Sequence, residues 1–328
     1  MLWQMAALIF LALVFDFLNG VHDSSNVVAT MIASRAFSPR FALGVTALAN
    51  FLGPFIFGVA VATTIGSEIA DSSAINIDVI LAALISAIVW NLLTWYLGIP
   101  SSSSHALIGG ILGAVLVGAG ISAIKPEGLV KVLVSLFLSP VLGLVCGYLF
   151  TLLVFFLARG ATPRINGFFK RSQLVTATAL ALSHGTNDAQ KTMGLITLGL
   201  VTAGYMESFV VPTWVILLSA GAIALGTALG GWRLIKTLGA RFFKIKPVDG
   251  FCSQATSAGV ILGASILGGP VSTTQVVSSS IMGVGAAERL NKVRWGVGGE
   301  IAVAWLLTIP STALLAAVVY WLMVALLP

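Results

Sequence analysis

The chain of 328 residues is 58% hydrophobic and only 9% charged, with a mean hydropathy of +1.04. Soluble domains carry about a quarter charged residues, so the composition excludes a soluble protein and predicts an integral membrane protein. The formal net charge of +6 comes without a basic run interleaved with aromatic residues, and this argues against a nucleic-acid-binding protein.

About ten apolar segments follow one another, most of them near the length of roughly 20 residues that crosses a bilayer. They lie at 2–34, 41–65, 79–98, 101–120, 128–158, 174–204, 213–231, 251–267, 272–286 and 295–327. The segments 101–120 and 272–286 are rich in Gly and Ser and follow a proline, so they either span the membrane or re-enter it. Polar residues near Gly20 and Gly185 interrupt two further segments, and we expect broken helices there.

The second half of the chain is a copy of the first. NGVHDSSN (19–26) aligns with HGTNDAQK (184–191), and GIPSSSSHALIGGILG (98–113) aligns with GGPVSTTQVVSSSIMG (268–283). We therefore divide the chain into an N-terminal membrane repeat at 1–158, a short basic linker at 159–172 and a C-terminal membrane repeat at 173–328.

Charge predicts the orientation of the chain. Basic residues concentrate in the connections 35–40, 159–172, 232–250 and 286–294, whereas the connection 66–78 contains Glu68, Asp71 and Asp78 and no basic residue. Basic connections stay in the cytoplasm, so both termini are expected outside the cell (inner or plasma) membrane. About five crossings per half then invert the second repeat. The predicted fold is all-α, with two inverted-topology repeats and broken or re-entrant helices at midplane, as in secondary transporters.

Asp23 and Asp188 occupy equivalent positions within apolar segments. A carboxylate at that depth is costly unless it is paired, protonated or bound to a cation. Asp188 has Lys191 three residues further on as a partner for an intrahelical ion pair. Two duplicated acids at two expected breaks nevertheless favour a cation site, with the neighbouring glycines permitting the helix to unwind.

PSSSSH (100–105) and PVSTTQ (270–275) each place hydroxyl residues between a proline and an apolar segment, which is a signal for a helix start. Free N–H groups, hydroxyls and the positive end of a helix dipole suit an oxyanion. The alternative is that these hydroxyls only cap and pack membrane helices. An anion site beside two carboxylates requires cations as well, so coupling follows from charge. Lys191 either adds positive charge near the oxyanion, extends toward the interface, or pairs with Asp188.

FDFLNGVHDSSNVVATMIASRA (15–36) and ALSHGTNDAQKTMGLITLGL (181–200), with PSSSSH and PVSTT, resemble the duplicated signature of the inorganic phosphate transporter (PiT) family. The resemblance covers essentially the whole chain and points to the bacterial low-affinity branch. It implies cation-coupled symport of inorganic phosphate, no enzymatic activity and a homodimer. The residues that we expect at phosphate are Ser102, Ser103, Ser104, Ser272, Thr273, Thr274, Asn187, Gln190 and Lys191. Those that we expect at the coupling cation are His22, Asp23, Asn26 and Asp188.

His22 departs from the asparagine that much of the family has, and Asn187 holds the equivalent position in the second copy. The histidine resembles the branch associated with protons and metal phosphate complexes. It either accepts a proton near neutral pH, binds a divalent metal together with Asp23 and Asp188, or only hydrogen-bonds across a helix interface. We expect no covalently bound cofactor. The coupling ion is a proton or sodium, and a divalent metal carried with phosphate is an additional possibility.

Other functions fit the sequence less well. A membrane enzyme acting on phosphoryl compounds would need a water-facing metal cluster or a nucleophile–base pair, and a channel would need a continuous polar lining. Another tetrahedral oxyanion, such as sulfate, is the alternative substrate of a symporter. Asp16, Asn50 and Glu300 also lie in apolar segments and either face the site or pair within the helix bundle.

Overall fold

The computed structural model describes residues 2–65 and 75–326, and these residues form helices joined by short connections, with no β-strand among them. The α-helices are α1 (Leu2–Ala33), α2 (Pro39–Phe57), α3 (Ala60–Thr63), α4 (Ile77–Leu97), α5 (Ser103–Gly118), α6 (Pro126–Leu157), α7 (Ile165–Thr202), α8 (Thr213–Leu229), α9 (Trp232–Ala240), α10 (Pro247–Ile266), α11 (Thr273–Glu288) and α12 (Trp295–Leu326). Two short 3₁₀ helices, η2 (Ile121–Ala123) and η3 (Leu290–Lys292), precede α6 and α12. The all-α prediction is confirmed. Glu68 and Asp71 of the acidic connection lie outside the described residues.

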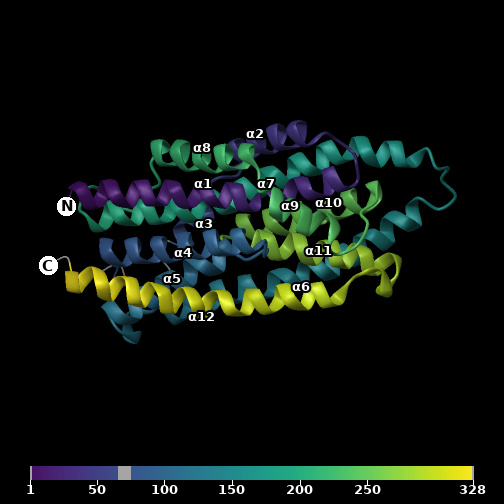
Figure 1. The fold of residues 1–328 in the computed structure, drawn as a ribbon. Coiled ribbons are helices and arrows are strands. Elements are labelled where there is room, and N and C mark those ends of the chain that lie inside the picture. The colour runs from purple at the N-terminus through teal and green to yellow at the C-terminus, as the bar shows by residue number, and fades with distance from the viewer. Residues whose placement is uncertain (1, 66–74, 327–328) are drawn as a thin grey trace.

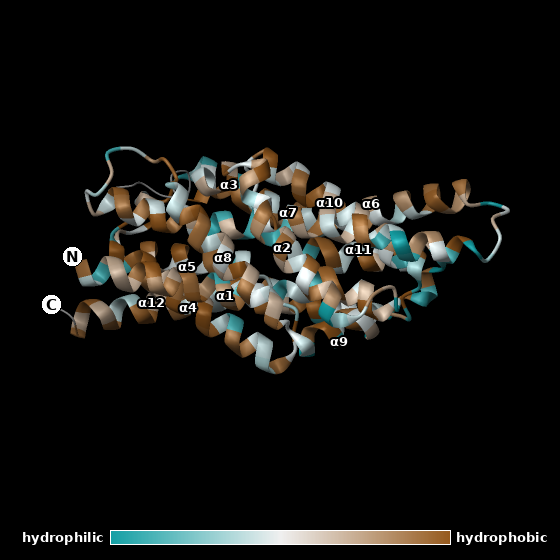
Figure 2. Ribbon diagram, turned by 90° about the horizontal axis from the view of Figure 1, so that it is seen from above, coloured by the Kyte–Doolittle hydropathy of each residue, from teal (hydrophilic) through white to brown (hydrophobic). Residues whose placement is uncertain are grey.

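The length and composition of the helices mark the chain as a membrane protein. In the described part of the chain, five helices, α1, α2, α4, α6 and α12, are long and apolar enough to cross a bilayer, and α5 is a shorter apolar helix. Helices α8 and α9 count together as a sixth span that bends by 70° at its break. Large apolar side chains such as Phe137 and Leu149 of α6 are exposed on the outside of the bundle, as lipid contact requires. Figure 2 shows hydrophobic residues over most of the helices.

The helices run in two series of the same order but opposite direction. Helix α1 leads away from the N-terminus, and the connection between α6 and α7 lies at the far end of the bundle (Figure 1). Helix α7 then runs back beside α1, and α12 returns the C-terminus to the end that holds the N-terminus. Corresponding helices of the two series therefore point in opposite directions, which is the inverted arrangement that the duplicated sequence predicts.

The two series are packed into each other. Helix α5 of the first packs along α12 of the second, and α11 packs along α6. In the same way, α1 packs against α8 and α2 against α7. Because each series supplies the neighbours of the other, α1 and α7 come together in the interior, next to the starts of α5 and α11.

The predicted helix breaks at Gly20 and Gly185 are wrong. Helices α1 and α7 are continuous through both residues. A Cβ atom at Gly20 would lie 2.2 Å from the carbonyl oxygen of Ile223 in α8, and one at Gly185 would lie 2.1 Å from that of Asn50 in α2. Glycine is present because the helix backbones touch, as is typical of membrane helix interfaces.

The connection predicted at 232–250 is also partly wrong, because residues 232–240 form α9. This helix is amphipathic, with Leu234, Ile235 and Leu238 buried against the bundle. Its charged residues conceal it from a search for long apolar segments. Among the described residues, the discontinuities include the break between α2 and α3, the bend between α8 and α9 and the interior starts of α5 and α11.

Candidate functional site

Helices α5 and α11 begin inside the bundle, and serine caps both starts. The Ser102 hydroxyl accepts a hydrogen bond from the backbone N–H of His105 over 3.1 Å, and the Ser272 hydroxyl accepts one from that of Gln275 over 3.3 Å. Both helix starts predicted from PSSSSH and PVSTTQ are confirmed. The first N–H groups of a helix have no partner within it, so each start directs free donors and a positive dipole end into the interior.

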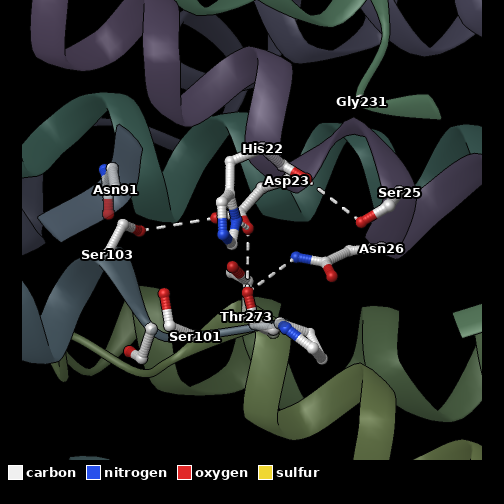
Figure 3. A network of polar contacts seen from close by, with 12 residues as sticks. His22, Asp23, Ser25, Asn26, Asn91, Ser101, Ser103, Gly231 and Thr273 are labelled. Carbon is white, nitrogen blue, oxygen red and sulfur yellow. Dashed lines mark hydrogen bonds and ion pairs between the residues drawn. The ribbon is translucent and has the colours of Figure 1, made fainter. Parts of the chain in front are cut away.

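The hydroxyl after each cap contacts an acid. Ser103 donates to Asp23 over 3.4 Å, and Thr273 donates to Asp188 over 2.9 Å. These two bonds join equivalent residues of the two repeats, so one arrangement occurs twice around a local twofold relationship. Figure 3 shows the bond between Ser103 and Asp23, with Thr273 close by.

The next hydroxyl in each helix contacts the opposite repeat. Lys191 donates to the Ser104 hydroxyl over 2.6 Å, and the Asn26 amide donates to the Thr274 hydroxyl over 3.1 Å. Thr274 in turn donates to Asp23 over 2.8 Å. The four hydroxyls at 103, 104, 273 and 274 therefore all lie within hydrogen-bonding distance of a charged or amide side chain of α1 or α7.

A histidine lies between the two acids. The Nε2 atom of His184 is 3.0 Å from Asp188 and 3.9 Å from Asp23, and its Nδ1 atom is 3.2 Å from the side-chain oxygen of Asn50. One ligand atom from each of Asp23, His184 and Asp188 falls within 4.8 Å of the others, a spacing that suits a metal ion. The sequence analysis did not assign His184 to the site.

The metal group of His22, Asp23 and Asp188 stays a prediction, and the geometry brings His184, not His22, between the two acids. In the described part of the chain, the His22 side chain has Asp23 as its polar partner, with its Nδ1 atom 2.9 Å from the carboxylate (Figure 3). His184 takes its place because residues at i and i+4 share a helix face, which directs His184 and Asp188 to the same point. That spacing in HGTND was the signal available in the sequence.

Lys191 forms an ion pair with Asp188, as one of its sequence interpretations has it, and also donates to the Ser104 hydroxyl; its role near the oxyanion stays a prediction. Its side chain is 1% exposed, and the acids Asp23 and Asp188 are 1% and 0% exposed. The site is thus closed to solvent in this conformation. Two carboxylates and one lysine give it a formal charge of −1 with neutral histidines.

Two predicted phosphate residues have other partners. The Gln190 side chain accepts hydrogen bonds from the backbone N–H groups of Val61 and Ala62 over 2.6 and 3.2 Å, and donates to the Gly58 carbonyl over 2.6 Å. Gln190 therefore secures the backbone where α3 begins. The Asn187 amide donates to the Ser265 hydroxyl over 2.9 Å, which turns its nitrogen toward α10. Neither amide contacts the hydroxyls of α5 and α11.

The remaining polar candidates divide between support and surface. Asn50 donates to Thr227 over 2.9 Å and positions His184 from the second side. Glu300 is 70% exposed and lies 3.8 Å from Arg241, so it belongs to the surface. His105, which the sequence analysis did not assign to the site, lies beside the α5 start with its Nδ1 atom 2.7 Å from the Ser102 hydroxyl.

Two helix series of opposite direction enclose a buried, charged site to which both repeats contribute equivalent contacts. This architecture defines a membrane transporter. Residues 19–164 and 157–316 each match the sequence profile described as "Phosphate transporter family". The chain belongs to the phosphate transporter family, and it is a multi-pass membrane transporter, not an enzyme.

Individual relatives agree over nearly the whole chain. It is 46% identical to a "Probable low-affinity inorganic phosphate transporter" of Rhizobium meliloti (strain 1021), over 97% of this chain and 96% of the relative. A protein of the same description from Bacillus subtilis (strain 168) is 44% identical over 95% of each chain. The solved structure entitled "The sodium-dependent phosphate transporter" superimposes with a TM-score of 0.89 at 26% identity, covering 99% of this chain and 100% of that one.

Proposed function

We propose that the chain carries inorganic phosphate across the membrane by symport with a cation. The observation that carries the proposal is the pair Asp23 and Asp188, held around His184 beside two capped helix starts. Phosphate approaching the hydroxyls also approaches both carboxylates. Since like charges repel strongly in a buried site, phosphate binds only when a cation offsets the acids.

The hydroxyls are the groups that exchange partners. In the closed site, Ser103 and Thr273 donate to the acids, and Ser104 accepts from Lys191. A cation bound to Asp23 and Asp188 weakens the hydrogen bonds that Ser103 and Thr273 donate to these carboxylates. The hydroxyls and the free N–H groups of α5 and α11 then donate to phosphate oxygens, and Lys191 supplies a fixed positive charge nearby.

Two carboxylates with one histidine favour a proton or a divalent metal at this point. Imidazole nitrogen is a common ligand of transition metals and a group that exchanges protons near neutral pH. The metal would reside on Asp23, His184 and Asp188 and supply positive charge to the bound phosphate. Sodium is the competing ion, and the related solved structure is described as sodium-dependent.

The experiment is uptake of radiolabelled phosphate into proteoliposomes that contain the purified protein, with sodium and proton gradients imposed separately, with and without magnesium. Accumulation that follows the proton gradient and requires magnesium supports a metal phosphate cargo. Accumulation that follows the proton gradient without magnesium supports protons alone, and a strict sodium requirement supports sodium. Absence of gradient-driven accumulation under all conditions overturns symport.

Asp23→Asn and Asp188→Asn test the role of the acids. Each substitution keeps the size of the side chain and removes its charge, so we expect concentrative uptake to be lost with folding intact. Glu300→Gln is the matched control, because Glu300 is exposed and far from the hydroxyl cluster by its contacts. Near-normal accumulation in both site variants contradicts the two-carboxylate mechanism. Unlabelled sulfate added in excess tests the substrate, and we expect it to leave phosphate uptake unchanged.

We also propose that both termini face outward from the cell membrane and that the protein functions as a homodimer. The support for the orientation is the basic connection between α6 and α7, which lies at the end of the bundle away from the termini (Figure 1). The orientation is tested by introducing a cysteine at either terminus of the protein and labelling intact cells with a reagent that does not cross the membrane. Chemical cross-linking of the purified protein in lipid tests the dimer.

A further inference from the structure

A third acid is buried in the bundle, outside the site described above. Asp16 lies on α1, seven residues before Asp23, so it occupies the same helix face about 10 Å closer to the N-terminus. Its exposed fraction is 0%. None of the contacts that bind the hydroxyls of α5 and α11 includes Asp16.

Among the described residues, hydrogen-bond partners are found for one oxygen of Asp16 and not for the other. Thr192 of α7 donates to Oδ1 over 2.5 Å, whereas Oδ2 is buried without a hydrogen bond. Ser219 of α8 faces the same carboxylate but makes no well-formed hydrogen bond to it. Among the described residues no lysine, arginine or histidine forms an ion pair with Asp16, since Lys191 is engaged by Asp188 and Ser104.

A buried amide accompanies this acid. Asn19 follows Asp16 by three residues on α1 and therefore shares its helix face. It is 0% exposed, and neither its oxygen nor its nitrogen has a hydrogen-bond partner in the described part of the chain. An unpaired buried polar group destabilises the fold, and an unpaired buried charge does so more strongly. Two adjacent groups with this defect indicate a ligand position.

The surroundings define the charge of the ligand. Asp188 and Lys191 of α7 are the charged groups that act on Asp16, and α8 carries no titratable residue at all. Helix α4, which also packs on α1, carries Asp78 and Tyr96 only near its two ends. The oxygens that can face a cation are Oδ2 of Asp16, Oδ1 of Asn19 and the hydroxyls of Thr192 and Ser219, and the amide nitrogen of Asn19 is a further unpaired atom.

We propose that Asp16 and Asn19 form a second cation site, which holds one monovalent cation between α1, α7 and α8. An all-oxygen set around a single carboxylate suits one unit of positive charge, in contrast to the histidine-containing group of Asp23, His184 and Asp188. A sodium ion and a proton supply the same charge, and the experiment distinguishes them. This cation neutralises the Asp16 carboxylate, which Lys191 does not pair with, and so lowers the negative charge of the bundle when phosphate is bound.

The site lies toward the end of the bundle that holds both termini (Figure 1). A cation bound there reaches the bundle separately from the one at Asp23 and Asp188, so it adds one charge to the cations moved with each phosphate. This role in coupling rests on the proposed symport. Occupancy of the site does not, because it is measured on purified protein without phosphate.

The experiment measures two properties of the wild type and of Asp16→Asn in detergent. Radioactive sodium binding at equilibrium counts bound sodium ions, and infrared spectroscopy detects the carbonyl band of a protonated carboxylic acid. A loss of one sodium ion per chain in Asp16→Asn supports a sodium site. Equal sodium binding with loss of one protonated-carboxyl band supports a proton. No difference in either property means that the position holds only water, and this overturns the proposal.

Matched variants separate binding from folding. Thr197→Val removes another fully buried hydroxyl of α7 that lacks a partner, and we expect wild-type binding from it. Asn19→Ala removes one proposed ligand and should weaken sodium binding, or deplete the protonated form, by about tenfold, which corresponds to about 1.4 kcal/mol. Elution on size exclusion checks that each variant is folded. If Asp16→Glu fails to restore the property that Asp16→Asn loses, the carboxylate is not a ligand.

Phosphate transport is assayed separately on the same preparations. If the wild type transports no phosphate but Asp16→Asn still loses a bound cation, symport fails while the cation site stands. If the wild type accumulates phosphate and Asp16→Asn binds cations as the wild type does, the cation site fails while symport stands.

Discussion

Lys191 of α7 donates a hydrogen bond of 2.6 Å to Ser104 of α5, so a charged side chain of the second repeat holds a hydroxyl of the first. The equivalent contact in the other direction joins Asn26 to Thr274 over 3.1 Å. The two contacts are therefore equivalent in geometry but not in charge, because the second repeat supplies the lysine Lys191 where the first supplies the amide Asn26. The single fixed cation lies on the Asp188 side, and Asp23 has only histidine and hydroxyl partners.

Lys191→Gln should reduce phosphate uptake more than it reduces expression. The glutamine keeps a donor for Ser104 but leaves Asp188 without its fixed positive partner, and breaking a buried ion pair costs about 3–5 kcal/mol. We expect the initial rate of phosphate uptake to fall at least tenfold and the melting temperature to drop. The rate is measured in proteoliposomes at matched protein density.

Lys236→Gln is the control for Lys191→Gln, because Lys236 is exposed on α9. The double variant Lys191→Gln with Asp188→Asn removes both charges and should recover much of the stability lost by Lys191→Gln, since no unpaired charge remains. Uptake should stay absent from it. Uptake at the wild-type rate in Lys191→Gln contradicts the role of the lysine near phosphate.

His184→Gln and His22→Gln should differ in their effects on the cation. His184 lies 3.0 Å from Asp188 and 3.9 Å from Asp23, whereas the His22 ring pairs with Asp23 and with neither other charged group of the described site. We expect His184→Gln to weaken divalent metal binding, measured by isothermal titration on purified protein, by at least tenfold. His22→Gln should change it less. An equal loss in both variants would mean that both histidines ligate the ion, and the reverse order would restore the sequence-based assignment.

The sequence predicted the apolar segments and the helix starts well, because both are encoded locally. Runs of apolar residues mark the long helices, and a proline followed by hydroxyl residues marks the starts of α5 and α11. Duplication selected the acids Asp23 and Asp188, because two equivalent carboxylates in apolar segments are costly unless they are paired or bound to a cation, and the structure buries both beside His184.

His184 and Gln190 show where sequence reasoning ended. Alignment of the repeats pairs His184 with Asn19, so duplication gave no reason to select it, and its role depends on how α7 packs against α1. Gln190 reaches the backbone of Val61 and Ala62 at the start of α3. The backbone N–H groups that require this acceptor lie more than a hundred positions away in the sequence, so no local pattern around Gln190 predicts the contact.

Gly20→Ala and Gly185→Ala test whether α1 and α7 are continuous and in close backbone contact with α8 and α2 at these glycines. An added Cβ would lie 2.2 Å from the Ile223 carbonyl oxygen or 2.1 Å from that of Asn50, so the helices must separate. We expect each variant to lose about 1–3 kcal/mol of stability, as overpacked cores do, and to melt at lower temperature in detergent. Gly44→Ala, with nothing within 4 Å of the added Cβ, should be neutral or slightly stabilising. Melting temperatures of Gly20→Ala and Gly185→Ala equal to that of the wild type would contradict these close backbone contacts.

Lys292 connects the first turn of α10 to the last turn of α11, at the end of the bundle away from the termini. Its ammonium group lies 3.1 Å from Asp249 and 2.7 Å from Glu288, and Asp249 is 2% exposed. Because α11 carries the hydroxyls at 273 and 274 at its other end, movement of this helix moves half of the site. Lys292→Gln leaves the buried Asp249 carboxylate without its ion-pair partner, so we expect a lower melting temperature and an altered maximal rate of uptake.

Lys246→Gln is the matched control: it removes only the 2.8 Å pair with Glu288, and its lysine is 55% exposed, so its effect should be within about 1 kcal/mol. Equal melting temperatures for the two variants would show that Asp249 gains nothing from Lys292, and that α10 and α11 are held together by packing alone.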